Sequence, residues 1–254
     1  MKIKNKVLYY FLPCFSLSLL LIGWVLISIK KPEFFPSPAA TWNRLLKLIK
    51  IPMARVPLYK HIWVSLRRVL IAIISASFFG VILGTFIGWN KHIKATIGSL
   101  FELLRPIPPI AWIPLITIWF GIGEFSKVLI IFIGTFAIVV TNTYTGVAMV
   151  DPLNIAVGKV FHAPKRHLLL DFVLPAALPA IFAGIRMAIG VGWAIVLAAE
   201  MVGATSGVGF LISRGNELRD MPLIFVCMFI IGIIGALISY GASLLERRLC
   251  PWNS

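Results

Sequence analysis

Long apolar runs alternate with shorter polar segments along almost the whole of the 254-residue chain. A transmembrane helix needs about 20 mainly apolar residues, and six runs meet that requirement. They lie at 7–29, 65–89, 95–120, 126–148, 181–203 and 222–245. The pattern therefore predicts an all-α membrane protein with about six transmembrane helices.

The first apolar run predicts a retained membrane anchor at residues 1–31. It is about twice as long as the apolar core of a signal peptide, and it ends in Lys30 and Lys31 instead of a small-residue cleavage site. Residues 32–64 form the first segment between spans, and residues 65–248 form the core transmembrane domain.

A short amphipathic helix is predicted within residues 32–64. Ser37 can cap this helix and Pro38 can occupy its first position. Two opposite faces follow with helical spacing, an apolar one with Trp42, Leu45, Leu46 and Ile49 and a polar one with Asn43, Arg44, Lys47 and Lys50. This pattern is typical of a helix lying flat at the membrane interface, and a helix that binds a partner protein is the alternative.

Small residues recur every four positions in two of the runs. They are Ala72, Ala76, Gly80, Gly84 and Gly88 in the second run, and Ala180, Gly184, Ala188 and Gly192 in the fifth. Such ridges let helix backbones approach closely in a membrane. The sequence therefore predicts a tightly packed helix bundle.

The third run contains three prolines within the four positions 106–109. Prolines remove backbone donors, and a broken helix is tolerated in lipid only where protein buries it or a cavity adjoins it. We therefore expect this stretch inside the assembly, beside a path through the membrane. Trp112 and Trp119 share a face if the helix resumes, as pathway residues or as ordinary interface packing.

Two further polar features interrupt the apolar runs. The fourth run ends in Thr141-Asn142-Thr143-Tyr144-Thr145, where hydrogen bonds between helices or a pore-facing role for Asn142 would explain the polarity. Glu200 ends the fifth run, and an acidic group in a membrane is costly unless it faces protein or water. Counting from Ile181 puts Glu200 near the end of the span, as a pathway or gate candidate.

After Glu200, the glycine-rich residues 203–209 predict a flexible loop, and they lack the Lys-Ser/Thr of a nucleotide-binding P-loop. Neither paired catalytic carboxylates nor a metal-ligand cluster stands out. The sequence therefore predicts no enzyme and no metal or cofactor in this chain. Cys14, Cys227 and Cys250 lie far apart without redox spacing and are interpreted as apolar packing residues.

Composition supports the membrane class and excludes another. Hydrophobic residues make up 59% of the chain and charged residues 13%, which places it outside the usual range of soluble domains. The formal charge of +15 could suggest nucleic-acid binding. Lys and Arg at the ends of spans are, however, what membrane topology demands, so nucleic acid is not expected as a partner.

Residues 151–180 form a long patterned interruption between two spans. Asp151-Pro152 opens a helix there, and Leu174-Pro175 with Pro179 is expected to close the segment. A turn near His162-Ala163-Pro164 then separates two short helices. Such a helix pair is well shaped to be gripped by another protein, and an ordinary loop is the alternative.

This segment and three others resemble the permeases of binding-protein-dependent ABC importers, most closely the nitrate, sulfonate and taurine branch. In the loop, Asp151-Pro152 is followed, after nine intervening residues, by His162-Ala163, a basic turn and a VLPAALP closure. The other matching segments are PSPAATW at 36–42, RPIPPIAWIPLITIWFGIGE at 105–124 and AEMVGATSGVGFLI at 199–212.

The resemblance implies a type I ABC importer permease fold in the inner membrane, with both termini in the cytoplasm. It implies a second permease copy, in a homodimer or a heterodimer, an external substrate-binding protein, and two ATP-binding subunits that hold the ATP. The 151–180 segment would be the cytoplasmic loop that couples to the ATPase, through Ala156, Lys159, His162, Ala163, Lys165 and Arg166. Candidates for the translocation pathway are Glu200, Trp112, Trp119 and Asn142.

The substrate suggested by this resemblance is a small oxyanion such as a sulfonate, taurine or nitrate. A permease for a heterocyclic vitamin precursor is the alternative. An ion-coupled secondary transporter would have to use Glu200 as its coupling group, and a membrane enzyme would have to combine Glu200, His162 and Asp171.

The loop departs from the family pattern at two places. Ala156-Val157-Gly158 stands where the family carries Glu-Ala-Ala, and His162 replaces a turn glycine. Glycine readily adopts a left-handed backbone conformation, which costs most other residues roughly 1 to 2 kcal/mol. The lost glutamate implies a compensating change in a dedicated ATPase, or a heterodimer whose other permease carries the fuller motif.

Overall fold

The computed structural model describes the backbone of residues 3–249 and the side chains of Leu12 and of residues 15–248. The predicted packing roles of Cys14 and Cys250 fall outside the described side chains. Along the described backbone the regular structure is helical, apart from one isolated β-bridge between Met53 and Val56. The all-α prediction is therefore confirmed.

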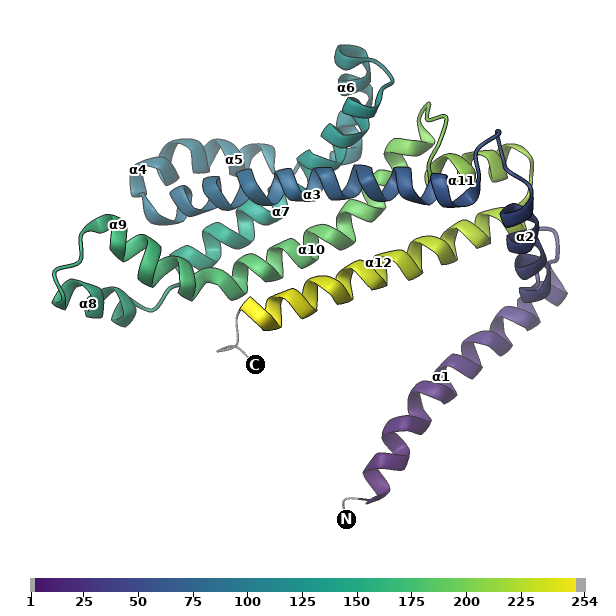
Figure 1. The fold of residues 1–254 in the computed structure, drawn as a ribbon, viewed down its shortest axis with the longest axis horizontal. Coiled ribbons are helices and arrows are strands. Elements are labelled where there is room, and N and C mark those ends of the chain that lie inside the picture. The colour runs from purple at the N-terminus through teal and green to yellow at the C-terminus, as the bar shows by residue number, and fades with distance from the viewer. Residues whose placement is uncertain (1–2, 250–254) are drawn as a thin grey trace. The chain divides into compact units, whose positions relative to one another are not determined.

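Figure 1 shows the helices in chain order. They are α1 (Ile3–Lys30), α2 (Pro38–Lys50), α3 (Leu58–Trp89), α4 (Lys91–Ile93), η1 (Lys94–Gly98), α5 (Ser99–Leu104), η2 (Pro109–Trp112), α6 (Ile113–Phe120), α7 (Glu124–Ala148), α8 (Pro152–Val160), α9 (Lys165–His167), η3 (Leu168–Val173), α10 (Leu174–Met201), α11 (Val208–Glu217) and α12 (Met221–Leu249). They form two compact units, one of residues up to 59 with 211–230, the other of residues 60–210 with those from 231 onward.

Four helices of the described chain are long and apolar enough to cross a membrane, against the six predicted spans. They are α3, α7, the continuous helix from Lys165 to Met201, and α12, and a bent helix pair raises the number to five if it counts as one span. The described side chains of α1 add a shorter apolar helix, Phe15–Lys30. The helix of the second predicted span begins earlier than residue 65, because α3 starts at Leu58.

The third predicted span is broken. The helical segments on its two sides, Lys91–Leu104 and Pro109–Phe120, meet at an angle of 84°. Pro108 has an extended backbone, and Pro109 opens the short 3-10 helix η2. The prediction that the prolines stop a regular helix is therefore confirmed.

The fifth span starts much earlier than predicted, because the helix runs without interruption through Leu174, Pro175 and Pro179. It spans Lys165–Met201, and a π-helical segment, η3, precedes the prolines. Prolines are tolerated inside transmembrane helices, where neighbouring groups and local π turns accommodate the lost backbone bonds. The expected second short helix of the 151–180 segment is thus wrong, since it forms the first turns of a long helix.

In the first unit, α2 starts where the sequence predicts, because the Ser37 hydroxyl accepts a hydrogen bond from the Ala40 N–H at 3.2 Å. Thr41 and Leu48 of this helix are buried, and Arg44 forms an ion pair of 2.6 Å with Asp220, whereas the other residues of the polar face are exposed. The opposite face, with Trp42 and Ile49, is exposed. The interfacial location of α2 stays a prediction.

Cys227 is buried with a free thiol, as expected of a packing residue.

In the second unit, α3, α7 and α10 lie alongside one another (Figure 1), with both small-residue ridges turned towards α7. A Cβ atom added to Gly84 of α3 would lie 2.7 Å from Cβ of Thr143 in α7, and Gly88 meets Val147 in the same way. Gly184 of α10 sits directly against Asn142. The close helix packing predicted from the ridges is therefore confirmed.

Candidate functional site

The loop between α7 and α10 carries the exposed helix α8. The carboxylate of Asp151 caps this helix by accepting a hydrogen bond from the Leu153 N–H at 2.8 Å, and Pro152 occupies its first turn. At the other end, the N–H of His162 donates to the Lys159 carbonyl, and the N–H of Ala163 donates to the Gly158 carbonyl. These two bonds form a Schellman motif, which needs a left-handed residue at its end.

His162 is that left-handed residue, with φ of +56°. The left-handed turn is therefore formed here with histidine, which is among the residues that tolerate this conformation better. Gly158 is buried where α8 contacts the π-helical segment, and a Cβ there would lie 3.2 Å from the Phe172 ring. Because Gly158 has no side chain, α8 can pack closely against the first turns of the long helix.

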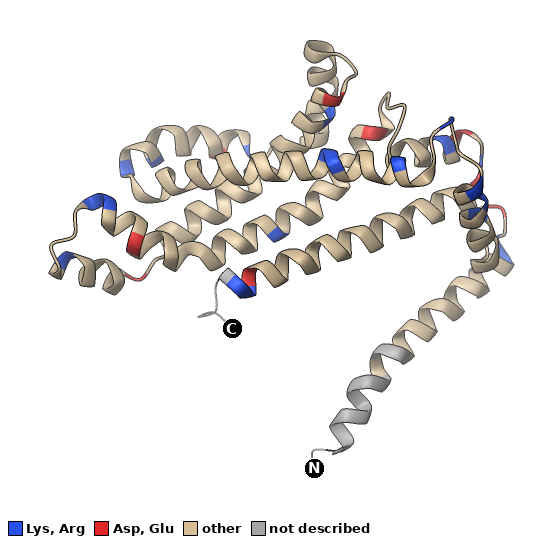
Figure 2. Ribbon diagram, viewed as in Figure 1, with Lys and Arg blue, Asp and Glu red and all other residues tan. Residues whose placement is uncertain are grey.

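The outer surface of this loop combines apolar and basic side chains. Leu153, Val160 and Phe161 are exposed, and Phe161 is 77% exposed. The predicted contact residues Ala156, Lys159, His162, Lys165 and Arg166 are exposed as well, while Ala163 is half-buried. Figure 2 shows the basic positions on this loop in blue. An exposed apolar helix with a basic rim has the properties of a protein docking surface.

Glu200 lies at the end of α10 and is only 1% exposed. It forms an ion pair of 2.6 Å with Arg68 of α3, and it accepts hydrogen bonds from the Ser65 hydroxyl at 2.8 Å and the Gly209 N–H at 2.9 Å. A buried carboxylate is stable only with such partners. The expectation that Glu200 faces protein is confirmed, while its part in transport stays a prediction.

Hydrogen bonds hold residues 203–209 at several points, and the predicted flexibility of this loop stays a prediction. The N–H of Gly207 donates to His61 Nδ1 at 3.1 Å, and the N–H of Val208 donates to the Ser65 hydroxyl at 2.8 Å. Arg68 donates to the Ser206 carbonyl at 2.9 Å. The sequence shows the glycines but not these partners, which come from a helix more than a hundred residues away.

Arg68 also binds Glu124, the first residue of α7, through two nitrogens. One guanidinium, in the N-terminal third of α3, therefore binds the start of α7, the end of α10 and the loop that follows. Arg68, Ser65 and Glu124 were not among the site residues predicted from the sequence. The sequence did offer one signal for such a partner. A carboxylate at position 200 is costly in a membrane unless a cation lies nearby, so a basic residue had to be close to it.

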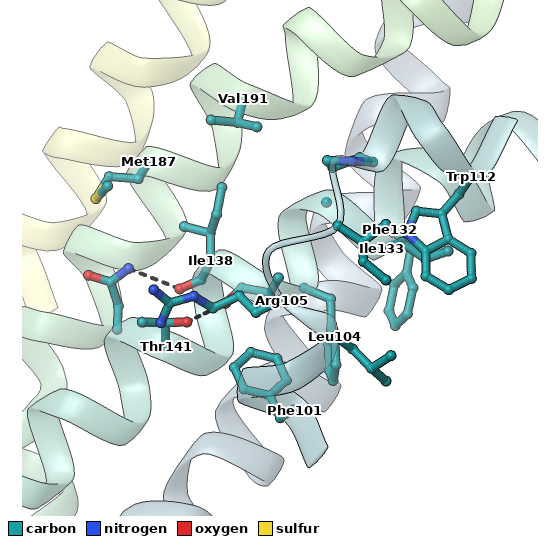
Figure 3. Close-up of a pocket in the computed structure, with 16 residues that line it drawn as sticks. Phe101, Leu104, Arg105, Trp112, Phe132, Ile133, Ile138, Thr141, Met187 and Val191 are labelled. Carbon is teal, nitrogen blue, oxygen red and sulfur yellow. Dashed lines mark hydrogen bonds between the residues drawn. The ribbon is translucent and has the colours of Figure 1, made fainter. Parts of the chain in front are cut away.

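A cavity of about 590 Å³ borders the broken third span in the second unit (Figure 3). Of the predicted pathway residues, Trp112 and Asn142 line it. Trp119 lies on α6, is exposed and contacts Phe120, and Glu200 lies in the separate buried cluster. The structure thus brings two of the four candidates together.

Two polar residues at the end of α7, Thr141 and Asn142, donate hydrogen bonds within their own helix, while the buried hydroxyl of Thr143 has no partner among the described residues. Thr141 Oγ1 donates to the Ala137 carbonyl at 2.8 Å, and Asn142 Nδ2 donates to the Ile138 carbonyl at 2.9 Å. Hydrogen bonds between helices, the simpler expectation for this stretch, are therefore not the explanation for these two residues. Among the described residues, no group of three or more His, Cys, Asp or Glu could hold a metal ion.

These features define a helical membrane protein with a broken span beside a cavity and an exposed docking helix between two spans. The chain belongs to the family of binding-protein-dependent transport system inner membrane components, which matches residues 76–252. It is 34% identical to the taurine transport system permease protein TauC of Escherichia coli (strain K12), over 92% of this chain and 86% of that protein.

Two further comparisons agree. The chain is 32% identical to the putative aliphatic sulfonates transport permease protein SsuC of Bacillus subtilis (strain 168), over 78% of this chain and 71% of that protein. Its fold is similar to a chain of the inward-facing MetNI methionine ABC transporter, with a TM-score of 0.67, 14% identity, and coverage of 81% of this chain and 98% of that chain.

Family membership confirms the type I importer permease fold and the coarse function. The chain is a permease component of an ABC importer of the inner membrane, and such components are transporter subunits and not enzymes. Membership also implies a substrate-binding protein and ATP-binding subunits as partners.

Proposed function

We propose that this chain is the membrane-spanning permease of an ATP-driven importer that takes up a small oxyanion, in the range of sulfonates, taurine and nitrate. It works as a dimer with a second permease, receives substrate from an external binding protein, and leaves ATP binding to two partner subunits. The names of its relatives, which refer to taurine and aliphatic sulfonates, support this substrate range.

The observation that carries the proposal is the geometry of α8. Its exposed side chains Val160 and Phe161 have no partner surface in the described chain, and the basic residues Lys159 and Lys165 surround them. Gly158 packs α8 tightly against the start of the long helix that includes α10. A push on α8 by a closing ATPase would therefore move α10 and, through their shared packing, α7.

Alternating access is the mechanism that we assign to this coupling, with the termini on the cytoplasmic side. The cavity beside Trp112 and Asn142 lies along the broken span and serves as part of the pathway. Glu200 and Arg68 join the helices at the end of α10 that is remote from α8. We assign them the role of positioning a gate of the pathway there. Trp119 stays a candidate residue of the translocation pathway, although its exposed side chain faces a partner subunit or lipid.

Reconstitution of the complete transporter in proteoliposomes tests the proposal. We expect uptake of a labelled sulfonate, taurine or nitrate that requires ATP, the ATPase subunits and the binding protein together. Uptake driven by an ion gradient without any ATPase subunit would instead identify a secondary transporter. Co-purification of the binding protein, and analysis of the ligand it holds, would identify the particular substrate.

A further inference from the structure

The cavity beside the broken span is lined mainly by apolar side chains. Phe101 and Leu104 come from α5, Phe132 from α7 and Val191 from α10 (Figure 3). Its volume of about 590 Å³ lies within the range of small-molecule sites, which are mostly apolar with a few placed polar groups. The cavity is therefore large enough for an organic molecule and poorly suited to a small, fully polar ion alone.

The polar side chains on its wall offer few free donors. The hydroxyl of Thr141 and one N–H of Asn142 are taken up by carbonyls of α7 itself. Apart from the indole N–H of Trp112 and the rest of the Asn142 amide, which are uncharged, the remaining surface is mostly carbon, so a charged ligand group placed against it would lose most of its hydration without compensation. Recognition of a charged group must therefore come from elsewhere on the lining.

Arg105 is the one charged side chain among the described residues that line the cavity. In Figure 3 its guanidinium reaches towards the wall that carries Thr141. Arg105 forms an ion pair of 3.3 Å with Glu102, and the side chains of the two residues are 44% and 48% exposed. Exposed pairs contribute little, so Arg105 can exchange this partner for a ligand anion.

The other arginines near this bundle are committed elsewhere. Arg68 is 1% exposed and is shared between Glu124 and Glu200. Arg186 pairs with Glu246 at 2.9 Å and does not line the cavity. Arg105, the arginine that is available for a ligand, thus lies at the break in the span and on the wall of the apolar cavity.

We propose that this cavity binds the transported substrate as an amphiphilic organic anion, with Arg105 holding an oxyanion head group and the apolar wall holding an alkyl or aryl group. The inference rests on the proposed importer function and narrows its substrate class. Nitrate has no apolar group to place. Taurine carries an ammonium group, and the described lining residues include no carboxylate to receive it.

Binding is measured on the permease purified with its ATPase subunits in nanodiscs and without the binding protein, whose own selectivity would otherwise dominate. The probes are ethane-, butane- and hexanesulfonate, with taurine and nitrate as polar counterparts. We expect affinity to rise about two- to fourfold per added methylene, as burial of each methylene predicts. Taurine and nitrate should compete poorly. Affinity independent of chain length, or equal competition by nitrate, would overturn the inference.

Variants separate the cavity from partition into lipid. Arg105→Gln should weaken binding of all the sulfonates about tenfold or more, because a hydrogen-bonded charge is lost, and should leave the chain-length dependence intact. Ala137→Phe, on the cavity wall, should abolish that dependence. Ile118→Phe, on the exposed surface of α6, is the matched control and should change neither.

The yield of the complex with the ATPase subunits shows whether each variant is folded. Arg105→Lys provides a second test, because it keeps the charge and should retain part of the affinity for the sulfonates. A chain-length dependence that survives Ala137→Phe would contradict the inference. The proposed function is tested independently: ATP-driven uptake of an oxyanion by a transporter whose cavity ignores the alkyl series would sink this inference and leave the importer function standing.

Discussion

The guanidinium of Arg68 lies 2.6 Å from the carboxylate of Glu200, and both residues are only 1% exposed. The two residues are separated by 132 positions in the sequence. Glu124 binds the same guanidinium from a third helix. One cation and two carboxylates therefore join the N-terminal third of α3 to the start of α7 and the end of α10.

Arg68→Met should strongly destabilise the permease. The substitution leaves the buried Glu200 without a cation, and removal of one partner of a buried ion pair costs about 3 to 5 kcal/mol. We expect a clear fall in the thermal unfolding temperature in detergent, measured by fluorescence, and a low yield of the ATPase complex.

Arg67→Met is the matched control, in the adjacent position of the same helix. Arg67 is half-exposed and its contact with Glu124 is 3.3 Å long, so its loss should cost less than about 1 kcal/mol. Equal destabilisation by the two variants would show that the buried pair has no special weight.

Glu200→Gln should impair transport while the ATPase still co-purifies. The amide keeps the shape of the side chain and can still bond to Ser65, and Arg68 retains Glu124. What is lost is the charge that positions the helix ends. ATP-driven uptake, normalised to the amount of assembled complex, measures the effect. Uptake at the wild-type level would reduce Glu200 to a packing residue.

Gly84→Ala should destabilise the helix bundle by about 1 to 3 kcal/mol, because overpacking forces helices apart. The added Cβ would lie 2.7 Å from the Val140 carbonyl oxygen, which cannot move without α7. Gly190→Ala in α10 is the control, since nothing lies within 4 Å of its Cβ position. It should be neutral or slightly stabilising, as alanine favours helix. Similar unfolding temperatures of the two variants would contradict the importance of the ridge.

The sequence predicts the fold well where one helix supplies the signal. The ridge that includes Gly84, the cap at Ser37 and the break at Pro108 depend on local spacing, and the structure confirms all three. It misleads at Pro175 and Pro179, because local proline rules apply poorly where a π-helical segment and neighbouring helices adjust the backbone.

The candidate site is less accessible to sequence reasoning, because it depends on distant residues. Glu200 stands out by its cost in a membrane, but its partners Ser65 and Arg68 become visible only when α3 and α10 are packed together. Trp112 and Trp119 look equivalent at helical spacing. The bend between α5 and α6 and the short 3-10 turn at Trp112 separate their environments, and spacing alone does not show this.

Gly158→Val should uncouple ATP hydrolysis from transport. A side chain at this position would meet the Phe172 ring and Leu168, so α8 would be pushed away from the long helix. We expect the ATPase to remain bound, while uptake per ATP hydrolysed falls. Val157→Ala, on the exposed side of α8, serves as the control for altered helix composition. Unchanged coupling in Gly158→Val would mean that force reaches the spans by another route.

Deletion of Phe161–Arg166 should abolish association with the ATPase, because it removes the exposed Phe161, the turn and the two basic residues that follow. Co-purification of the ATPase with the deletion variant at the wild-type yield would contradict the assignment of this loop as the coupling site. Thermal unfolding of the deletion variant in detergent checks that the helix bundle itself remains folded.

His162 separates two ways in which the ATPase can recognise this loop. Its backbone φ of +56° suits glycine without strain, whereas a β-branched residue is a steric outlier in that region. If the partner recognises the shape of the turn, His162→Gly preserves association and His162→Val weakens it. We expect this outcome, because the Schellman bonds of His162 and Ala163 hold the turn that presents Phe161. Loss of association in His162→Gly would instead show that the imidazole itself makes the contact, and pull-down of the ATPase with both variants distinguishes the two.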